Sequence, residues 1–243
     1  MNDSPDFSTV AAVHAPGHQP WTIARRFRGF MPVVVDVETG GLNPATDALL
    51  ELAAVILDVD AQGQLIPVDR VQVHVAPFEG ANLNENSMKI HGIDVDHPFR
   101  GAVPEAEALA QFFQPIRQRT KLIGARRAIL VGHNAAFDLA VINAACARTG
   151  NKKNPFHPFS TLDTVTLSAL AVGETVLAKA LDAIGIGWDG SQAHAALYDA
   201  EQTAALFCKI VNHFSTERGR APLRQRPPAP AVASEAPIDT DGD

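Results

Sequence analysis

Features that would form disulfides or span a membrane are scarce in this chain. Two cysteines, Cys146 and Cys208, occur in 243 residues, and both lie in apolar helical patterns. This excludes a disulfide framework, and we expect buried thiols in a reducing compartment. The sequence has no uninterrupted run of about 18 apolar residues and no N-terminal run that resembles a signal peptide. We therefore expect a cytoplasmic protein without a membrane span.

Basic charge is also limited. The chain has 20 Lys and Arg residues against 27 Asp and Glu residues, which gives a formal net charge of −7. This balance excludes a uniformly basic coat for nucleic acid. It does not exclude a local basic patch, because phosphate binding depends on clustering rather than on the total charge. Hydrophobic residues make up 46% of the chain, which is enough to build one sizeable core.

The two ends of the chain differ in composition from its middle. Residues 1–22 show no sustained periodicity, and residues 215–243 are rich in Pro and Ala. Neither segment has the apolar content that an ordered core requires, so we expect a flexible N-terminal segment and a disordered tail. The remainder, residues 23–214, is expected to be one compact domain.

The pattern of this middle region predicts an α/β fold. Short apolar, β-branched runs predict strands, and longer periodic segments predict helices. The predicted strands are 31–38, 49–60, 71–75 and 128–132, and the predicted helices are 104–119, 134–149, a helix beginning at 163, 174–184 and 195–214. Short connections among the first three strands favour antiparallel neighbours, so the sheet should be mixed.

Acidic residues lie at the end of one predicted strand and shortly after another. Asp36 and Glu38 are two positions apart, so their side chains point to the same face of a strand. Two adjacent carboxylates repel each other, and a divalent cation such as Mg²⁺ or Mn²⁺ removes that repulsion. Asp138 comes early in the helix after strand 128–132. Each acid alone also fits a simpler role, either at a solvent-exposed strand end or near a positive helix N-terminus.

A histidine and a fourth acid lie near the start of the last helix. His194 precedes Asp199 by five residues, a spacing that would place them on different sides of one straight helix. His194 is therefore expected on the loop that enters the helix. A histidine in this position suits general-base chemistry near neutral pH, although an isolated surface histidine is the simpler alternative.

Together, three sequence segments resemble the motifs of the DEDDh superfamily of 3′→5′ exonucleases, which has a ribonuclease H-like fold. They are DVETGG (36–41), GHNAAFD (132–138) and HAALYDAEQTA (194–204). The segments RFRGFMPVVVDVETGG and NPFHPF are similar to the ribonuclease T family within it, and the resemblance extends from about residue 27 to 214. It implies a mixed five-stranded sheet flanked by helices. It also implies that Asp36, Glu38, Asp138 and Asp199 bind two Mg²⁺ ions, or Mn²⁺, and that His194 is the general base.

The resemblance further implies a 3′→5′ exoribonuclease that releases 5′-mononucleotides. Its expected substrates are the 3′ ends of tRNA and other stable RNAs, and single-stranded DNA. A proofreading DNA exonuclease and an oligoribonuclease share the same motifs and remain alternatives. An inactive RNA-binding module is a further alternative, but binding alone does not require a cluster of carboxylates that repels phosphate.

The residues expected to contact substrate depart from the family pattern in part. Phe137 and Phe159 match two positions at which the family stacks bases, although core packing is an alternative for both. Leu42 and Ile90 replace two further phenylalanines, and Asn86 replaces a glutamate near the terminal base. Discrimination against a 3′-terminal cytosine is therefore an open question. Gly40 and Gly41 are expected to let backbone amides approach the terminal nucleotide.

Basic residues lie before the strands whose other ends carry the acids. The cations expected to contact substrate are Arg26, Arg28, Lys121, Arg127 and Lys152. Arg28 and Arg127 directly precede these strands, and at about 3.3 Å per residue they lie roughly 20–25 Å from the acids of their own chain. A two-fold homodimer would place each basic patch opposite the partner's acids, and the family resemblance implies such a dimer. Solvated surface charge is the alternative.

Overall fold

The computed structural model describes Ile23 and residues 26–218. The flexibility predicted for residues 1–22 and for the tail beyond 218 therefore concerns residues outside the described part. The last helix reaches Arg218, past its predicted end at residue 214.

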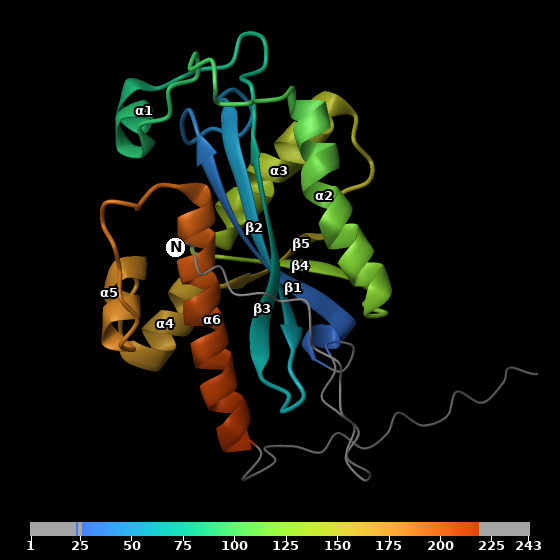
Figure 1. Cartoon of the computed structure of the whole chain (residues 1–243), viewed down its shortest axis with the longest axis vertical. Helices are drawn as coiled ribbons and strands as arrows, with labels where there is room; N and C mark the ends of the chain where they lie inside the picture. Colours follow the sequence, from blue (N-terminus) through green and yellow to red (C-terminus); the bar gives the residue numbers. More distant parts are fainter. Residues whose placement is uncertain (1–22, 24–25, 219–243) are drawn as a thin grey trace, which may run out of the picture.

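The described chain forms the mixed five-stranded sheet that was predicted (Figure 1). Its strands run in the spatial order β3-β2-β1-β4-β5. They are β1 (Phe30–Thr39), β2 (Leu49–Val59), β3 (Leu65–His74), β4 (Arg127–Gly132) and β5 (Phe156–Asp163). β1 pairs antiparallel with β2 and parallel with β4. The antiparallel meander and the parallel crossover strands thus meet at β1.

The central strand extends beyond its parallel neighbour. β1 pairs with β4 from Phe30 as far as Val34, which lies opposite Val131. Beyond that point β1 pairs only with β2 among the described strands, and Asp36 and Glu38 lie in this overhanging part. The apolar stretch from Met31 to Val35 anchors the strand in the core, so its acidic end is held rigidly at the sheet edge.

Helices cover both faces of the sheet (Figure 1). The helix α6 (Ala196–Arg218) contacts β1, β2 and β3 and is flanked by α4 and α5, while α2 and α3 contact the sheet from the other side. Their bounds are α2 (Glu105–Leu122), α3 (Ala135–Thr149), α4 (Thr164–Val172) and α5 (Leu177–Ala183). A short helix, α1 (Glu85–His91), lies near the end of β1, and a 3₁₀ turn (Phe27–Gly29) precedes that strand.

The structure contains two elements that the sequence pattern did not predict. No residue of α1 is buried, so this helix has no apolar face for a periodicity to reveal. β5 is an edge strand that contains Pro158 and an irregular register with β4, features that argue against a strand in a sequence. The other strands and helices match the predicted elements, although β3 begins earlier and α5 later than expected.

One stretch, residues 164–183, has the length and the hydropathy (mean value 1.4) that a membrane-crossing helix requires. In the structure it is divided between α4 and α5, and Gly173 ends α4 in a left-handed conformation. Both helices contact α6, where Leu181 packs against Leu206 and Ile210 in a small apolar cluster.

Candidate active site

Four carboxylates converge at the overhanging end of β1. Asp36 and Glu38 lie on the strand itself, Asp138 on the first turn of α3, and Asp199 on the first turn of α6. Glu38, Asp138 and Asp199 are buried. The charge of each of these three acids acts on Asp36, which places all four in one electrostatic unit.

Burial and mutual repulsion raise the pKa values of these acids. Burial raises the pKa of Glu38 to about 8, and the charges of Asp199, Glu51 and Asp138 add to the shift. The pKa of Asp138 rises to about 7, again mainly through burial, although backbone N–H groups partly oppose the rise. The pKa of Asp36 is raised well above its usual range by burial and then by Asp138 and Glu38. A bound cation would oppose both effects and favour the ionised forms of these acids.

His194 lies on the loop immediately before α6 and faces the same cluster. Its backbone has a positive φ of 65°, and its N–H donates to Asp199 Oδ2 over 3.0 Å. This hydrogen bond stabilises the left-handed backbone conformation of His194, and the His194 side chain points toward the acids. Ligand atoms of Glu38, His194 and Asp199 lie within 4.8 Å of one another.

The donor set fits a hard divalent cation. Asp199 Oδ1 is buried, and no hydrogen-bond donor among the described residues reaches it. An unpaired buried carboxylate oxygen is costly, and a cation is the partner that offsets this cost. Oxygen ligands of this kind suit Mg²⁺ or Mn²⁺. Glu38 and Asp199 therefore form, with His194 beside them, the best-defined part of the candidate metal site.

A fifth acid, Glu51, belongs to the same cluster and is not predictable from the sequence. It lies on β2 directly opposite Glu38 and is buried. Its carboxylate accepts hydrogen bonds from Gln72 Nε2 and from the N–H of Ala196, at 3.4 Å in the latter case, and lies 3.3 Å from His74 Nδ1. Glu51 thus connects the catalytic strand to the start of α6. No pattern within β2 signals this, because the contact depends on the register between strands.

The glycine pair after β1 has a packing role that the sequence did not reveal. A Cβ atom on Gly40 would lie 2.5 Å from the Asn82 carbonyl oxygen, and one on Gly41 would lie 2.1 Å from Asp47 Oδ2. The amide of Gly40 donates to the Ala48 carbonyl over 2.8 Å. The β1–β2 connection thus uses this amide in the structure, and its contact with the terminal nucleotide stays a prediction.

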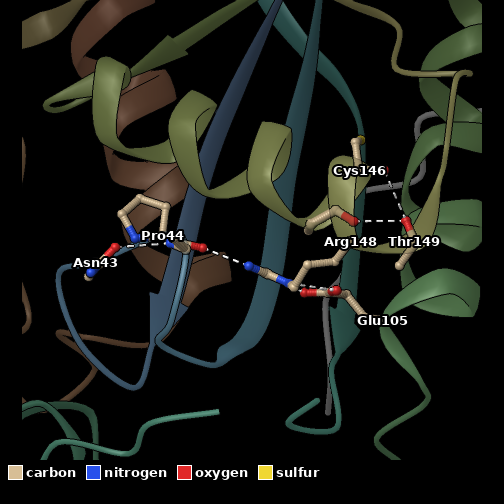
Figure 2. Close-up of polar contacts among 8 residues, drawn as sticks. Asn43, Pro44, Glu105, Cys146, Arg148 and Thr149 are labelled. Carbon is tan, nitrogen blue, oxygen red and sulfur yellow. Dashed lines mark hydrogen bonds and ion pairs between the residues drawn. The ribbon is translucent and has the colours of Figure 1, made fainter. Parts of the chain in front are cut away.

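Arg148 fastens the loop after β1 to the rest of the domain (Figure 2). The guanidinium forms two hydrogen bonds with the Glu105 carboxylate, donates to the Pro44 carbonyl over 2.7 Å, and lies 4.3 Å from the Phe78 ring centroid. The loop that carries Leu42 is thus held by an α3 side chain, Arg148, which in turn is paired with Glu105 of α2.

Large apolar side chains at three of the predicted contact positions are exposed to an unusual degree. Leu42 is 83% exposed on the loop after β1, Ile90 is 60% exposed on α1, and Phe159 is 80% exposed on β5. Asn86 lies exposed on α1, which is tied to the site by a hydrogen bond from Asn84 N–H to the Gly40 carbonyl. Exposed apolar groups of this size suit contacts with a partner better than they suit the core.

The remaining predicted contact residues divide into two groups. Phe137 is half-buried and packs against the main core, so part of its ring has a structural role.

The basic residues lie at the opposite end of the strands from the carboxylates, as their sequence positions require. Four cations contribute to a cavity of about 310 Å³ there. Its lining residues are Arg117, Thr120, Lys121, Ala125, Arg126, Arg127, Asn154 and Pro155. The exposed Arg28 precedes β1, whose first residue is paired with Arg127, and Lys152 lies shortly before β5.

Comparison with known proteins identifies the family. The model of the exonuclease family RNase_T matches residues 33–207. Ribonuclease T of Histophilus somni (strain 129Pt) is 51% identical over 191 residues, which cover 79% of this chain and 88% of that protein.

Solved structures agree with the observed fold. E. coli exonuclease I, solved with a dT13 oligonucleotide, superposes with a TM-score of 0.57 at 20% identity, over 79% of this chain. A full-length 3′-exonuclease gives a TM-score of 0.60 at 18% identity, over 76% of this chain. The present chain spans 42% and 61% of those two proteins. It belongs to the DEDD exonuclease family as a homologue of ribonuclease T, and is thus a phosphodiester hydrolase.

Proposed function

We propose that this exonuclease is a Mg²⁺-dependent 3′→5′ exoribonuclease. Its substrates are the 3′ ends of tRNA and other stable RNAs, together with single-stranded DNA, and its products are 5′-mononucleotides. The observation that carries the proposal is the cluster of four carboxylates with His194 at the free end of β1, in which Asp199 Oδ1 has no donor among the described residues.

The acids divide between two Mg²⁺ ions, which Mn²⁺ can replace. Asp36, Glu38 and Asp199 would hold one ion, and Asp36 with Asp138 would hold the other. Bound there, such ions acidify an attacking water and stabilise the leaving 3′ oxygen. His194 takes up the proton of the water, because its loop position leaves the ring beside Glu38 and Asp199.

The 3′ end of the substrate lies against the exposed apolar groups. Leu42 and Ile90 press on the terminal base, while Phe137 and Phe159 stack on bases. Asn86 and the backbone of Gly41 supply polar contacts. Aliphatic side chains at two of these positions lose the stacking energy of an aromatic ring, so we infer weaker base discrimination than four phenylalanines would provide.

The working form is a two-fold homodimer in the cytoplasm. Arg26, Arg28, Lys121, Arg127 and Lys152 would hold the RNA backbone for the partner's carboxylates, since they lie at the far end of their own strands. Subunit exchange between Asp36→Asn protein and an Arg126→Glu/Arg127→Glu variant should restore activity in mixed dimers. No recovery after demonstrated exchange, or a monomer in sedimentation, would contradict this arrangement.

One assay tests the reaction itself. RNA labelled at its 5′ end is incubated with the enzyme in Mg²⁺ or in EDTA. A ladder that shortens from the 3′ end, one nucleotide at a time and only with Mg²⁺, is expected. Faster turnover of a dinucleotide or of mismatched duplex DNA than of a tRNA 3′ end would instead support an oligoribonuclease or a proofreading exonuclease.

A further inference from the structure

Phe159 lies on an irregular part of the edge strand β5. Ala128 of β4 pairs with Phe156, but Leu130 pairs with Thr161, so the segment between Phe156 and Thr161 is longer than the β4 segment opposite it. Phe159 lies in this extra length with 80% of its surface exposed. The regular ladder therefore does not fix its backbone, and another group has to do so.

The adjacent His157 supplies that support through its Nδ1 atom. Nδ1 accepts the N–H of Ser160 at 2.9 Å and that of Phe159 at 3.4 Å, which closes the chain into a tight turn. An accepting Nδ1 assigns the ring proton to Nε2.

The imidazole ring also connects Phe159 to the core. It packs edge-on against the Phe159 ring, with centroids 4.6 Å apart and an interplanar angle of 87°. On its other side it contacts Phe30, the buried first residue of β1, at 5.4 Å. The Arg28 guanidinium lies 5.2 Å from the Phe30 ring centroid. The exposed Phe159 ring is thus the last of three rings in contact, and the first of them, Phe30, lies beside the Arg28 guanidinium.

The turn has a second anchor on α3. Asn143 Nδ2 donates to the Pro158 carbonyl at 3.4 Å, and Asn154 Nδ2 donates to Asn143 Oδ1 at 3.0 Å. Side chains on both sides of Pro158 therefore hold the turn that presents Phe159. An apolar residue that only filled space would not need such a support.

We propose that His157 is a positioning residue, which preorganises Phe159 as a stacking platform for a base of single-stranded nucleic acid. This inference rests on the proposed function of Phe159. A platform held in one orientation binds more tightly than a mobile ring, because less conformational freedom is lost on binding. The hydrogen bonds to Nδ1 set the turn, so their loss should weaken binding even when Phe159 is present.

A double-mutant cycle tests this role in the inactive Asp36→Asn background. Binding of a fluorescent single-stranded RNA of about ten nucleotides is measured by anisotropy in Mg²⁺. Phe159→Ala should weaken binding about 5- to 100-fold if the ring stacks on a base. His157→Ala should weaken binding about 5- to 20-fold, and should cause no further loss in the Phe159→Ala background.

Two conservative variants separate the turn from general packing. His157→Asn restores an oxygen acceptor for the backbone N–H groups, as in an Asx turn, and should recover most of the affinity. His157→Phe keeps the ring contacts without the acceptor and should behave like His157→Ala. The matched control is His213→Ala on α6, which removes the histidine of another edge-on His–Phe pair and should leave binding unchanged.

Kinetics distinguish positioning from a loss of folded enzyme. In the otherwise unmodified chain, His157→Ala should raise KM for single-stranded RNA and leave kcat within about two-fold. An unchanged affinity of Phe159→Ala would refute the proposed stacking by Phe159. A clear effect of Phe159→Ala with additive or absent effects of His157→Ala, or no rescue by His157→Asn, would refute the role of His157 alone.

Discussion

The titration of Glu38 makes it possible to measure how much the assembled carboxylate cluster lowers the free energy of unfolding. Its pKa rises from 4.5 to about 8, mainly because the side chain is buried and then because Asp199 lies close by. A carboxyl group with a raised pKa in the folded state binds more protons than it does in the unfolded state. The free energy of unfolding of the metal-free protein must therefore fall as the pH rises from about 4.5 to 8.

The size of the effect follows from the same shift. Full ionisation of Glu38 alone would cost about 3–5 kcal/mol, an upper bound because neighbouring acids share the penalty. Glu38→Gln removes this titration. In EDTA at pH 8.5 the variant should be more stable than the unmodified protein by up to that amount, and near pH 5 the two should be similar.

Urea denaturation followed by circular dichroism measures both profiles between pH 5 and 9. Added Mg²⁺ should stabilise the unmodified protein most at high pH and should have much less effect on Glu38→Gln. Glu85→Gln, at an exposed position on α1, controls for the substitution itself. A flat profile for the unmodified protein in EDTA, or a Glu38→Gln profile just as steep, would refute the reasoning.

Three further substitutions test other parts of the site. Asp36→Asn should abolish turnover and leave the fold intact, as judged by circular dichroism, because it removes a ligand proposed for both ions. His194→Ala should lower kcat by about 10²–10⁴-fold in single-turnover assays, and a wild-type rate would exclude it as the base. Arg148→Ala leaves Glu105 without its cation, so it should lower the free energy of unfolding by about 3 kcal/mol in urea and raise KM through the loosened loop. An unchanged KM in a destabilised protein would show that the anchor has no part in substrate binding.

Most of the sheet was predictable because β1, β2 and β4 each contain an uninterrupted apolar run. Residues 31–35 of β1 are buried, and such runs have few alternatives to a central strand. The four acids were recognisable through three motifs taken together rather than singly. Asp36 and Glu38 lie at the end of an apolar strand, and Asp138 and Asp199 lie near helix starts. β5 and α1 were not predicted as elements. Their structure depends on partners distant in sequence, such as the contact between Asn143 and Pro158, rather than on a pattern of their own.

Some buried acids of this domain are compensated by protein donors and one is not, and the sequence does not show which acid belongs to which group. Glu105 is paired with Arg148, and Glu51 accepts from Gln72 and Ala196, so protein donors already compensate both carboxylates. Asp199 has one oxygen that no donor among the described residues reaches. An uncompensated buried charge lowers the stability of the folded protein. A bound ligand of opposite charge removes this cost. Lack of a donor therefore makes Asp199 a candidate ligand for a cation, while Glu51, also buried and opposite Glu38, accepts a hydrogen bond from the start of α6.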